Sequence, residues 1–230
     1  MKTFASHTLV RNGKPFVDLV LRQVVPFANR CLITISEKST DGTLEILEQL
    51  KKEFPDKIFI DFENVQSPGQ LTQERQKQVE KTFEDWILFL DDDDYWPEEN
   101  LVKMVELINK EEDIDGYSVN PYQVIDKSHH DWDWRNKSFS KWFKNQKGIN
   151  YRHPWPRDMI YLNDQVLYHK VNPRMKRIDT RFFHLSYIKG YSFRNEEWAK
   201  TFAHRIGSKV EIPQEMMKHI WKIYEQLNRS

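Results

Sequence analysis

The sequence predicts an α/β fold in which a mostly parallel sheet is flanked by helices. Short apolar runs alternate with segments of helical periodicity through the first half of the chain, as in parallel α/β sheets. The clearest run, residues 86–90, is rich in aromatic and branched side chains, is bounded by Pro97, and runs directly into four aspartates at residues 91–94. Ligands of open α/β sheets bind at the carboxyl ends of the strands, so these acids are predicted to lie at a ligand-binding edge.

Local sequence signals predict each helix and strand of the first half. The apolar runs at residues 3–10, 31–35, 57–62 and 86–90 predict four strands. Pro15 suits the first position of a helix, and turn and capping residues at 39–43 precede a second helix with apolar side chains at helical spacing up to residue 54. Ser67 and Pro68 open a polar helix that ends near residue 83. Pro97 and two glutamates introduce a fourth helix, whose apolar stripe comprises Leu101, Met104, Val105 and Ile108.

The pattern weakens after residue 114. Residues 114–124 predict a strand, and residues 126–137 predict a loop because they have no clear period. Residues 149–170 predict strands with a turn at Asn163 and Asp164. Residues 195–205 predict a helix with Gly207 just beyond its C-terminus, and residues 213–227 predict a terminal helix.

Composition excludes several classes of function. Lys and Arg number 35, as do Asp and Glu, so no overall electrostatic field favours nucleic acid or a membrane surface. Cys31 is the single cysteine, which excludes a disulfide framework and a cysteine-based zinc site. Neither a signal-peptide core nor an apolar stretch of transmembrane length is evident in the sequence. We therefore expect a cytoplasmic protein.

The four aspartates predict a cation site. Adjacent carboxylates repel one another, and a cation allows them to stay ionised together. Oxygen ligands suit Mg²⁺ or Mn²⁺, and Mg²⁺ usually completes its shell with phosphate oxygens and water, so a metal–diphosphate site is predicted. The run also fits a solvated acidic turn that stabilises the next helix N-terminus. A calcium loop of the EF-hand type is disfavoured, because Trp96 and Val102 stand where that loop needs Gly and Glu.

The order of several motifs resembles the family 2 glycosyltransferases with the GT-A fold. These motifs are Asn12, the Ser-Thr-Asp-Gly-Thr turn at residues 39–43, Arg75 and the aspartate run. The resemblance covers the first half of the chain best. It implies metal-dependent transfer of a sugar from a nucleoside diphosphate sugar, most commonly a UDP sugar, to a hydroxyl of a glycan, lipid-linked or other acceptor, with inversion. No repeat or flexible linker divides the sequence, which predicts one domain with a nucleotide-sugar-binding half at residues 1–122 and an acceptor half at residues 123–230 that includes the C-terminal helices.

The resemblance assigns roles to individual residues. Ser36 stands where the family usually has an Asp that contacts the base, with Glu37 beside it, which leaves the base open. Asp92 falls at a variable position and is expected to be dispensable. The implied ligands of Mn²⁺ or Mg²⁺ are Asp93, Asp94 and His184, and the implied nucleotide-sugar-binding residues are Thr8, Asn12, Ser36, Glu37, Asp41, Arg75, Asp91 and Asp93.

Three of these assignments have plain structural alternatives. Arg75 lies in a segment rich in polar and charged residues, where a solvated charge is equally expected, and Asp41 suits a turn whatever the function. His184 lies among apolar residues, where a histidine is usually a hydrogen-bonded structural residue.

Asp158 is the predicted general base, since an inverting transfer needs a carboxylate beside the acceptor hydroxyl. An ion pair between Asp158 and Arg152 or Arg157 is an equal alternative, and Asp131 or Asp133 are other candidates for the base.

Two other functions remain open. A nucleotidyltransferase on a related sheet also uses acids and a metal, but it normally has a Gly-rich basic loop after the first strand, and only the Arg-Asn-Gly-Lys segment at residues 11–14 is available. A glycan-binding protein derived from the fold would bind sugars without metal or nucleotide.

Overall fold

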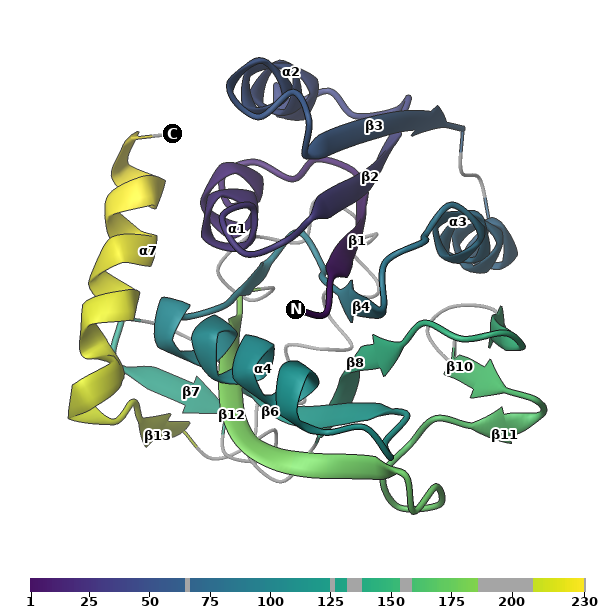
Figure 1. The fold of residues 1–230 in the computed structure, drawn as a ribbon. Coiled ribbons are helices and arrows are strands. Elements are labelled where there is room, and N and C mark those ends of the chain that lie inside the picture. Colours follow the sequence, from purple (N-terminus) through teal and green to yellow (C-terminus); the bar gives the residue numbers. More distant parts are fainter. Residues whose placement is uncertain (65–66, 125–126, 132–137, 154–158, 186–208, 230) are drawn as a thin grey trace.

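The computed structural model describes residues 1–64, 67–124, 127–131, 138–153, 159–185 and 209–229 (Figure 1). Its main sheet has eight strands within these ranges, in the order β3-β2-β1-β4-β8-β6-β12-β5. From one edge to the other, the strands are Ile58–Glu63, Arg30–Ser36, Phe4–Val10, Trp86–Phe89, Phe139–Lys144, Gly116–Gln123, Met175–His184 and Asp94–Tyr95.

The first four strands are parallel, and β6 pairs with β12 in parallel, whereas β8 runs antiparallel to both β4 and β6. Helices follow the early strands as the sequence predicts: α1 is Val17–Val24, α2 is Thr43–Glu53, α3 is Pro68–Glu80 and α4 is Glu98–Lys110. The predicted fold class, a largely parallel sheet flanked by helices, is confirmed.

The two faces of the sheet carry separate apolar cores. Successive side chains of a strand point to opposite faces, so Trp86 and Leu88 of β4 join one core while Ile87 joins the other. The larger core packs beneath α1, α2 and α4. The smaller core includes Val79 of α3, which Figure 1 shows on the opposite side of β1 from α1. The sheet is therefore covered on both faces, as parallel strands require.

The second half adds small sheets and a terminal helix. Strands β9 (Ile149–Arg152), β10 (Met159–Leu162) and β11 (Gln165–Val166) form one sheet, and Asn163 and Asp164 make the predicted turn with φ of 45° and 70°. A 3₁₀ turn, Gln214–Met216, leads into α7, Met217–Arg229. No helix among the described residues is both long and apolar enough to cross a membrane. The predicted helix at residues 195–205 and its Gly207 lie outside the described residues.

One prediction for the second half is wrong, and one strand was missed. Residues 126–137 are not simply a loop, because His129–Asp131 form strand β7, which pairs with Lys209–Glu211 of β13. A partner about 80 residues away stabilises this strand, and no local pattern signals such a partner. The central strand β8 was not predicted, because it buries a lysine between aromatic side chains and so lacks a plain apolar run.

Candidate active site

The aspartates fold back onto a strand that is distant in sequence. Strand β4 ends at Phe89, and the amide of Asp94 donates to the carbonyl of Asp91 at 3.0 Å, which closes a tight turn. The next residues form β5, which pairs with β12 so that Asp94 lies opposite His184. The predicted acids and the predicted histidine are therefore brought together at the carboxyl end of β4, where an α/β sheet places its ligands.

The carboxylate of Asp94 lies at the centre of this group and is fully buried. Its Oδ1 is 2.7 Å from Nδ1 of His184, and its Oδ2 is 2.5 Å from Nζ of Lys141. Oδ1 of Asp93 lies 3.5 Å from the same His184 nitrogen. Asp93, Asp94 and His184 each offer a ligand atom, and these atoms lie within 4.8 Å of one another. Two carboxylates and an imidazole so close together fit a divalent cation.

Asp91 lies on the other side of Lys141. Its Oδ2 accepts a hydrogen bond from Nζ of Lys141 at 2.8 Å, and its Oδ1 accepts one from Nη2 of Arg75 at 3.0 Å. The guanidinium of Arg75 also lies over the ring of Phe89, 3.6 Å from its centroid. Arg75 is buried. Helix α3 therefore points the Arg75 guanidinium into the acid cluster. The alternative, in which Arg75 is a solvated charge on the helix surface, is wrong.

Burial and charge act against each other in this cluster. Burial alone would raise the pKa of Asp91, but the charges of Lys141 and Arg75 outweigh it and lower that pKa below its usual range. Burial raises the pKa of Asp94, and the charge of Asp91 adds to this effect. Burial would lower the pKa values of Lys141 and His184, but the neighbouring aspartates raise both. The cluster thus carries alternating charges in a region of low solvent access.

Comparison with known proteins identifies the family. The model of glycosyl transferase family 2 matches residues 14–172, which is more than half of the chain. The chain belongs to this family. No curated protein matches the chain.

Several solved structures match part of the chain. S. aureus TarS 1–349 in complex with UDP is 17% identical, with a TM-score of 0.45 over 56% of this chain and 41% of that one. The mannosyltransferase PcManGT from Pyrobaculum calidifontis, in complex with GDP-Man and Mn²⁺, is 15% identical, with a TM-score of 0.44 over 54% and 36%. GalNAc-T7 with UDP, GalNAc and Mn²⁺ is 13% identical, with a TM-score of 0.43 over 53% and 23%. The matched region therefore spans less than half of each of these proteins.

Lys141 is the residue of the acid cluster that sequence reasoning missed. It lies buried on β8, where the pairing with β6 shifts register between Tyr117 and Ser118. The only local signal is a lysine at a position of the alternating pattern that otherwise carries aromatic side chains. A lysine on a buried strand needs an acidic partner, and the aspartate run provides that partner here.

The loop after β1 is held by the predicted turn at residues 39–43. The amide of Gly13 donates to Oγ1 of Thr43 at 2.7 Å, and that of Lys14 donates to Oδ2 of Asp41 at 3.0 Å. Oδ1 of Asn12 accepts the amide of Thr40 at 2.9 Å. Asn12 and Asp41 therefore fix the conformation of this loop, and for Asp41 this is the turn role that the sequence suggested as its alternative.

The remaining predicted nucleotide-sugar-binding residues differ in exposure. Thr8 is fully buried within β1, Ser36 is buried at the end of β2, and Glu37 is exposed just beyond it. Asp92 packs beside Gly13, where a Cβ added to the glycine would lie 3.1 Å from Oδ2 of Asp92. The aspartate run is therefore in contact with the loop after β1 as well as with β8 and β12.

Several predicted acceptor-side residues lie outside the described residues, namely Asp158, Asp133 and Arg157, together with the side chain of Asp131. The adjacent described residues are tied to α3, the helix that carries Arg75. Oγ1 of Thr72 donates to the carbonyl of His153 at 2.7 Å, and the amide of Tyr151 donates to Oε1 of Gln76 at 2.9 Å. The β9–β10 hairpin is thus anchored to the same helix as the acid cluster.

Proposed function

We propose that the chain is a metal-dependent glycosyltransferase. It moves a sugar from a nucleoside diphosphate sugar, with a UDP sugar as the first candidate, to an acceptor hydroxyl, and the anomeric configuration is inverted. The observation that carries this proposal is the convergence of Asp93, Asp94 and His184 next to the Arg75–Asp91 pair, in a chain of glycosyl transferase family 2. These ligands come from two distant segments, which a solvated acidic turn would not require.

Donor binding uses the carboxyl end of β4. Asp91, whose side chain is 30% exposed despite its two cationic partners, faces the ribose of the donor together with Asp93. A divalent cation held by Asp93, Asp94 and His184 would neutralise charge on the departing nucleoside diphosphate. An imidazole ligand beside the carboxylates favours Mn²⁺ over Mg²⁺, which prefers an all-oxygen shell. Arg75 orients Asp91 and adds positive charge close to the diphosphate.

Proton removal is assigned to Asp158 in the acceptor half, residues 123–230. A carboxylate on the acceptor side takes the hydroxyl proton as the new bond forms at the anomeric carbon, on the face opposite the leaving diphosphate. Asp131 and Asp133 are the alternative bases. Replacement of each acid by Asn separates them: only the base variant loses turnover while it retains donor binding.

The loop after β1 disfavours a nucleotidyltransferase. An enzyme of that class needs free backbone amides in this loop to bind phosphate. Here the amides of Asn12, Gly13 and Lys14 donate to side chains of the 39–43 turn at 3.3, 2.7 and 3.0 Å. Product analysis provides the direct check, because glycosyl transfer releases a nucleoside diphosphate, whereas nucleotidyl transfer from a triphosphate releases pyrophosphate.

Two neighbouring aspartates provide a matched test of the site. Asp93→Asn removes a predicted metal ligand, whereas Asp92→Asn changes the adjacent acid, which is expected to be dispensable. Calorimetry with UDP and Mn²⁺ should show at least about tenfold weaker binding for Asp93→Asn and a change below about threefold for Asp92→Asn. Unchanged binding by Asp93→Asn would refute the site assignment. A screen of nucleotide sugars for Mn²⁺-dependent thermal stabilisation then identifies the donor, because bound ligand stabilises the fold.

A further inference from the structure

Lys141 places a fixed positive charge inside the acid cluster. Its side chain is 5% exposed, and its Nζ lies between Oδ2 of Asp91 at 2.8 Å and Oδ2 of Asp94 at 2.5 Å. The rings of Phe89 and Phe182 flank the ammonium, with centroids 4.7 and 5.2 Å from Nζ. Two carboxylates and two aromatic rings thus hold the ammonium in one position.

This position makes Lys141 a poor direct ligand for substrate. Its Nζ already donates to two carboxylates, and its burial keeps it away from solvent. A lysine that contacted phosphate would have to give up the buried ion pairs with Asp91 and Asp94, which is unfavourable in a site of low solvent access. Its effect on ligands is therefore exerted through its charge.

The net charge of the acid cluster shows how Lys141 affects ligand binding. Asp91, Asp93 and Asp94 contribute three negative charges, and Arg75 and Lys141 contribute two positive ones, so the cluster has a net charge of about −1 when His184 is neutral. Without the lysine the net charge would be about −2. The more negative cluster attracts a divalent cation more strongly and repels an anionic diphosphate more strongly.

We propose that Lys141 is an internal counter-ion with two opposite effects on ligands. It lowers the affinity of the cluster for a divalent cation in the absence of nucleotide, and it raises the affinity for the diphosphate of the donor. Metal uptake is thereby made dependent on the arrival of the donor. This inference rests on the proposed function, because that function supplies the diphosphate.

The test uses Lys141→Met, which keeps the length and apolar stem of the side chain and removes its charge. Calorimetry without nucleotide should show Mn²⁺ binding at least about tenfold tighter than in the unmodified chain. Calorimetry with UDP at saturating Mn²⁺ should show at least about tenfold weaker binding.

Lys144→Met is the matched control on the same strand. Nζ of Lys144 donates to the carbonyl of Glu112 at 3.0 Å and is not part of the acid cluster, so both affinities should stay within about threefold of the unmodified chain. A thermal melt without ligand checks that each variant is folded. If Lys141→Met does not fold, Lys141→Gln undergoes the same two titrations.

The two affinities must change in opposite directions. A merely structural role for Lys141 would weaken both, and that result, or an unchanged Mn²⁺ affinity, would overturn the inference. Failure of the proposed function is distinguishable, because the unmodified chain would then bind no nucleoside diphosphate, whereas tighter Mn²⁺ binding by Lys141→Met would still support the counter-ion role.

Discussion

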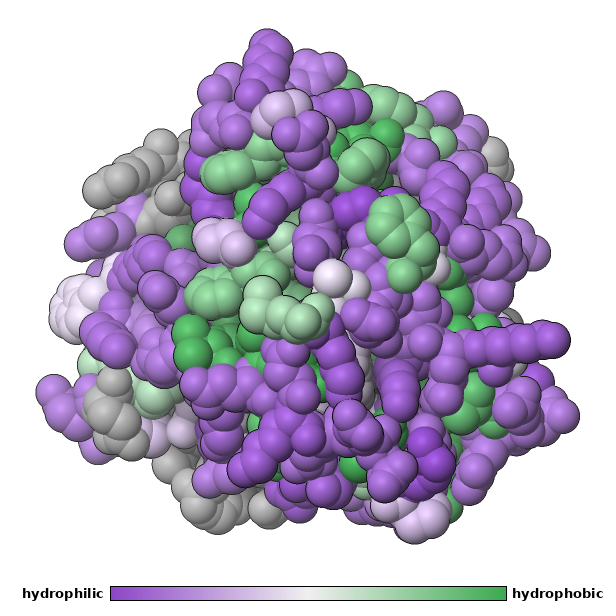
Figure 2. All heavy atoms as spheres, in the orientation of Figure 1, coloured by the Kyte–Doolittle hydropathy of each residue, from purple (hydrophilic) through white to green (hydrophobic). Residues whose placement is uncertain are grey.

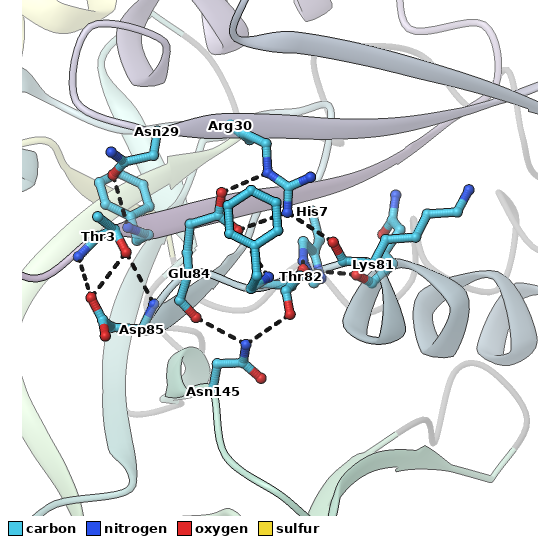
Figure 3. Close-up of polar contacts among 12 residues, drawn as sticks. Thr3, His7, Asn29, Arg30, Lys81, Thr82, Glu84, Asp85 and Asn145 are labelled. Carbon is cyan, nitrogen blue, oxygen red and sulfur yellow. Dashed lines mark hydrogen bonds and ion pairs between the residues drawn. The ribbon is translucent and has the colours of Figure 1, made fainter.

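Acid should destabilise the fold through His7 on β1. Nε2 of His7 lies 2.6 Å from Oγ1 of Thr82 (Figure 3). Thr82 donates its own hydroxyl proton to the carbonyl of Gln78 at 2.8 Å. Thr82 must therefore accept, so Nε2 of His7 carries the proton. Nδ1 is buried and lacks a hydrogen-bond partner among the described residues. Protonation of Nδ1 would bury an unpaired charge.

The size of this effect follows from the pKa of His7. Burial, followed by the charges of Arg75 and Arg30, lowers this pKa from 6.5 to about 3. As the pH falls below 6.5 the unfolded chain takes up a proton that the folded chain refuses, so stability is lost with acid. The loss is about 1.4 kcal/mol per pH unit between 6.5 and 3, which amounts to about 2 kcal/mol between pH 7 and pH 5.

Urea denaturation at pH 7 and pH 5 measures this loss, with His7→Gln as the reference. The glutamine amide can still donate to Thr82 but does not titrate, so the other titrating groups cancel in the difference. Over this range the free energy of unfolding of the unmodified chain should fall by about 2 kcal/mol more than that of His7→Gln. Equal falls in the two proteins would refute the neutral buried state of His7.

Two further predictions concern packing and a buried ion pair, each measured as a free energy of unfolding in urea. Gly116→Ala should cost about 2 kcal/mol or more, because its Cβ would lie 2.3 Å from the carbonyl oxygen of Trp142, and a loss under about 0.5 kcal/mol would show that β6 and β8 do not pack so closely. Glu84→Gln should cost about 3 kcal/mol, because the buried Glu84 accepts from Arg30 at 2.6 and 2.9 Å. Lys81→Met, which breaks the exposed ion pair with Asp61, should cost less than about 1 kcal/mol, and equal costs for these two variants would contradict the importance of burial.

The first half of the fold was predictable because its signals are local. Strands β1 to β4 and helices α1 to α4 lie within three residues of their predicted ends. The apolar runs, Pro15 and the capping residues before α2 and α3 each act on the nearest few residues. Ser67, for example, forms a complete capping box with Gln70. The order of these elements also placed the aspartate run at the carboxyl end of β4.

The site was predictable only in part, because its geometry depends on distant pairings. The pairing of β5 with β12 brings His184 beside Asp94 across 90 residues of sequence. The insertion of β8 between β4 and β6 brings Lys141 to the same carboxylate across 47 residues. The family resemblance predicted a role for His184, whereas no motif in the sequence predicted one for Lys141.

The sequence by itself determined the fold class, the family and the identity of the acids, because periodicity, capping and motif order are properties of neighbouring residues. Only the tertiary structure decided how those acids are neutralised. Asp91 is shared between Arg75 and Lys141, and Asp94 between Lys141 and His184. Buried carboxylates require counter-charges within a few ångströms, and strand pairing over long sequence separations selects which cations are that close.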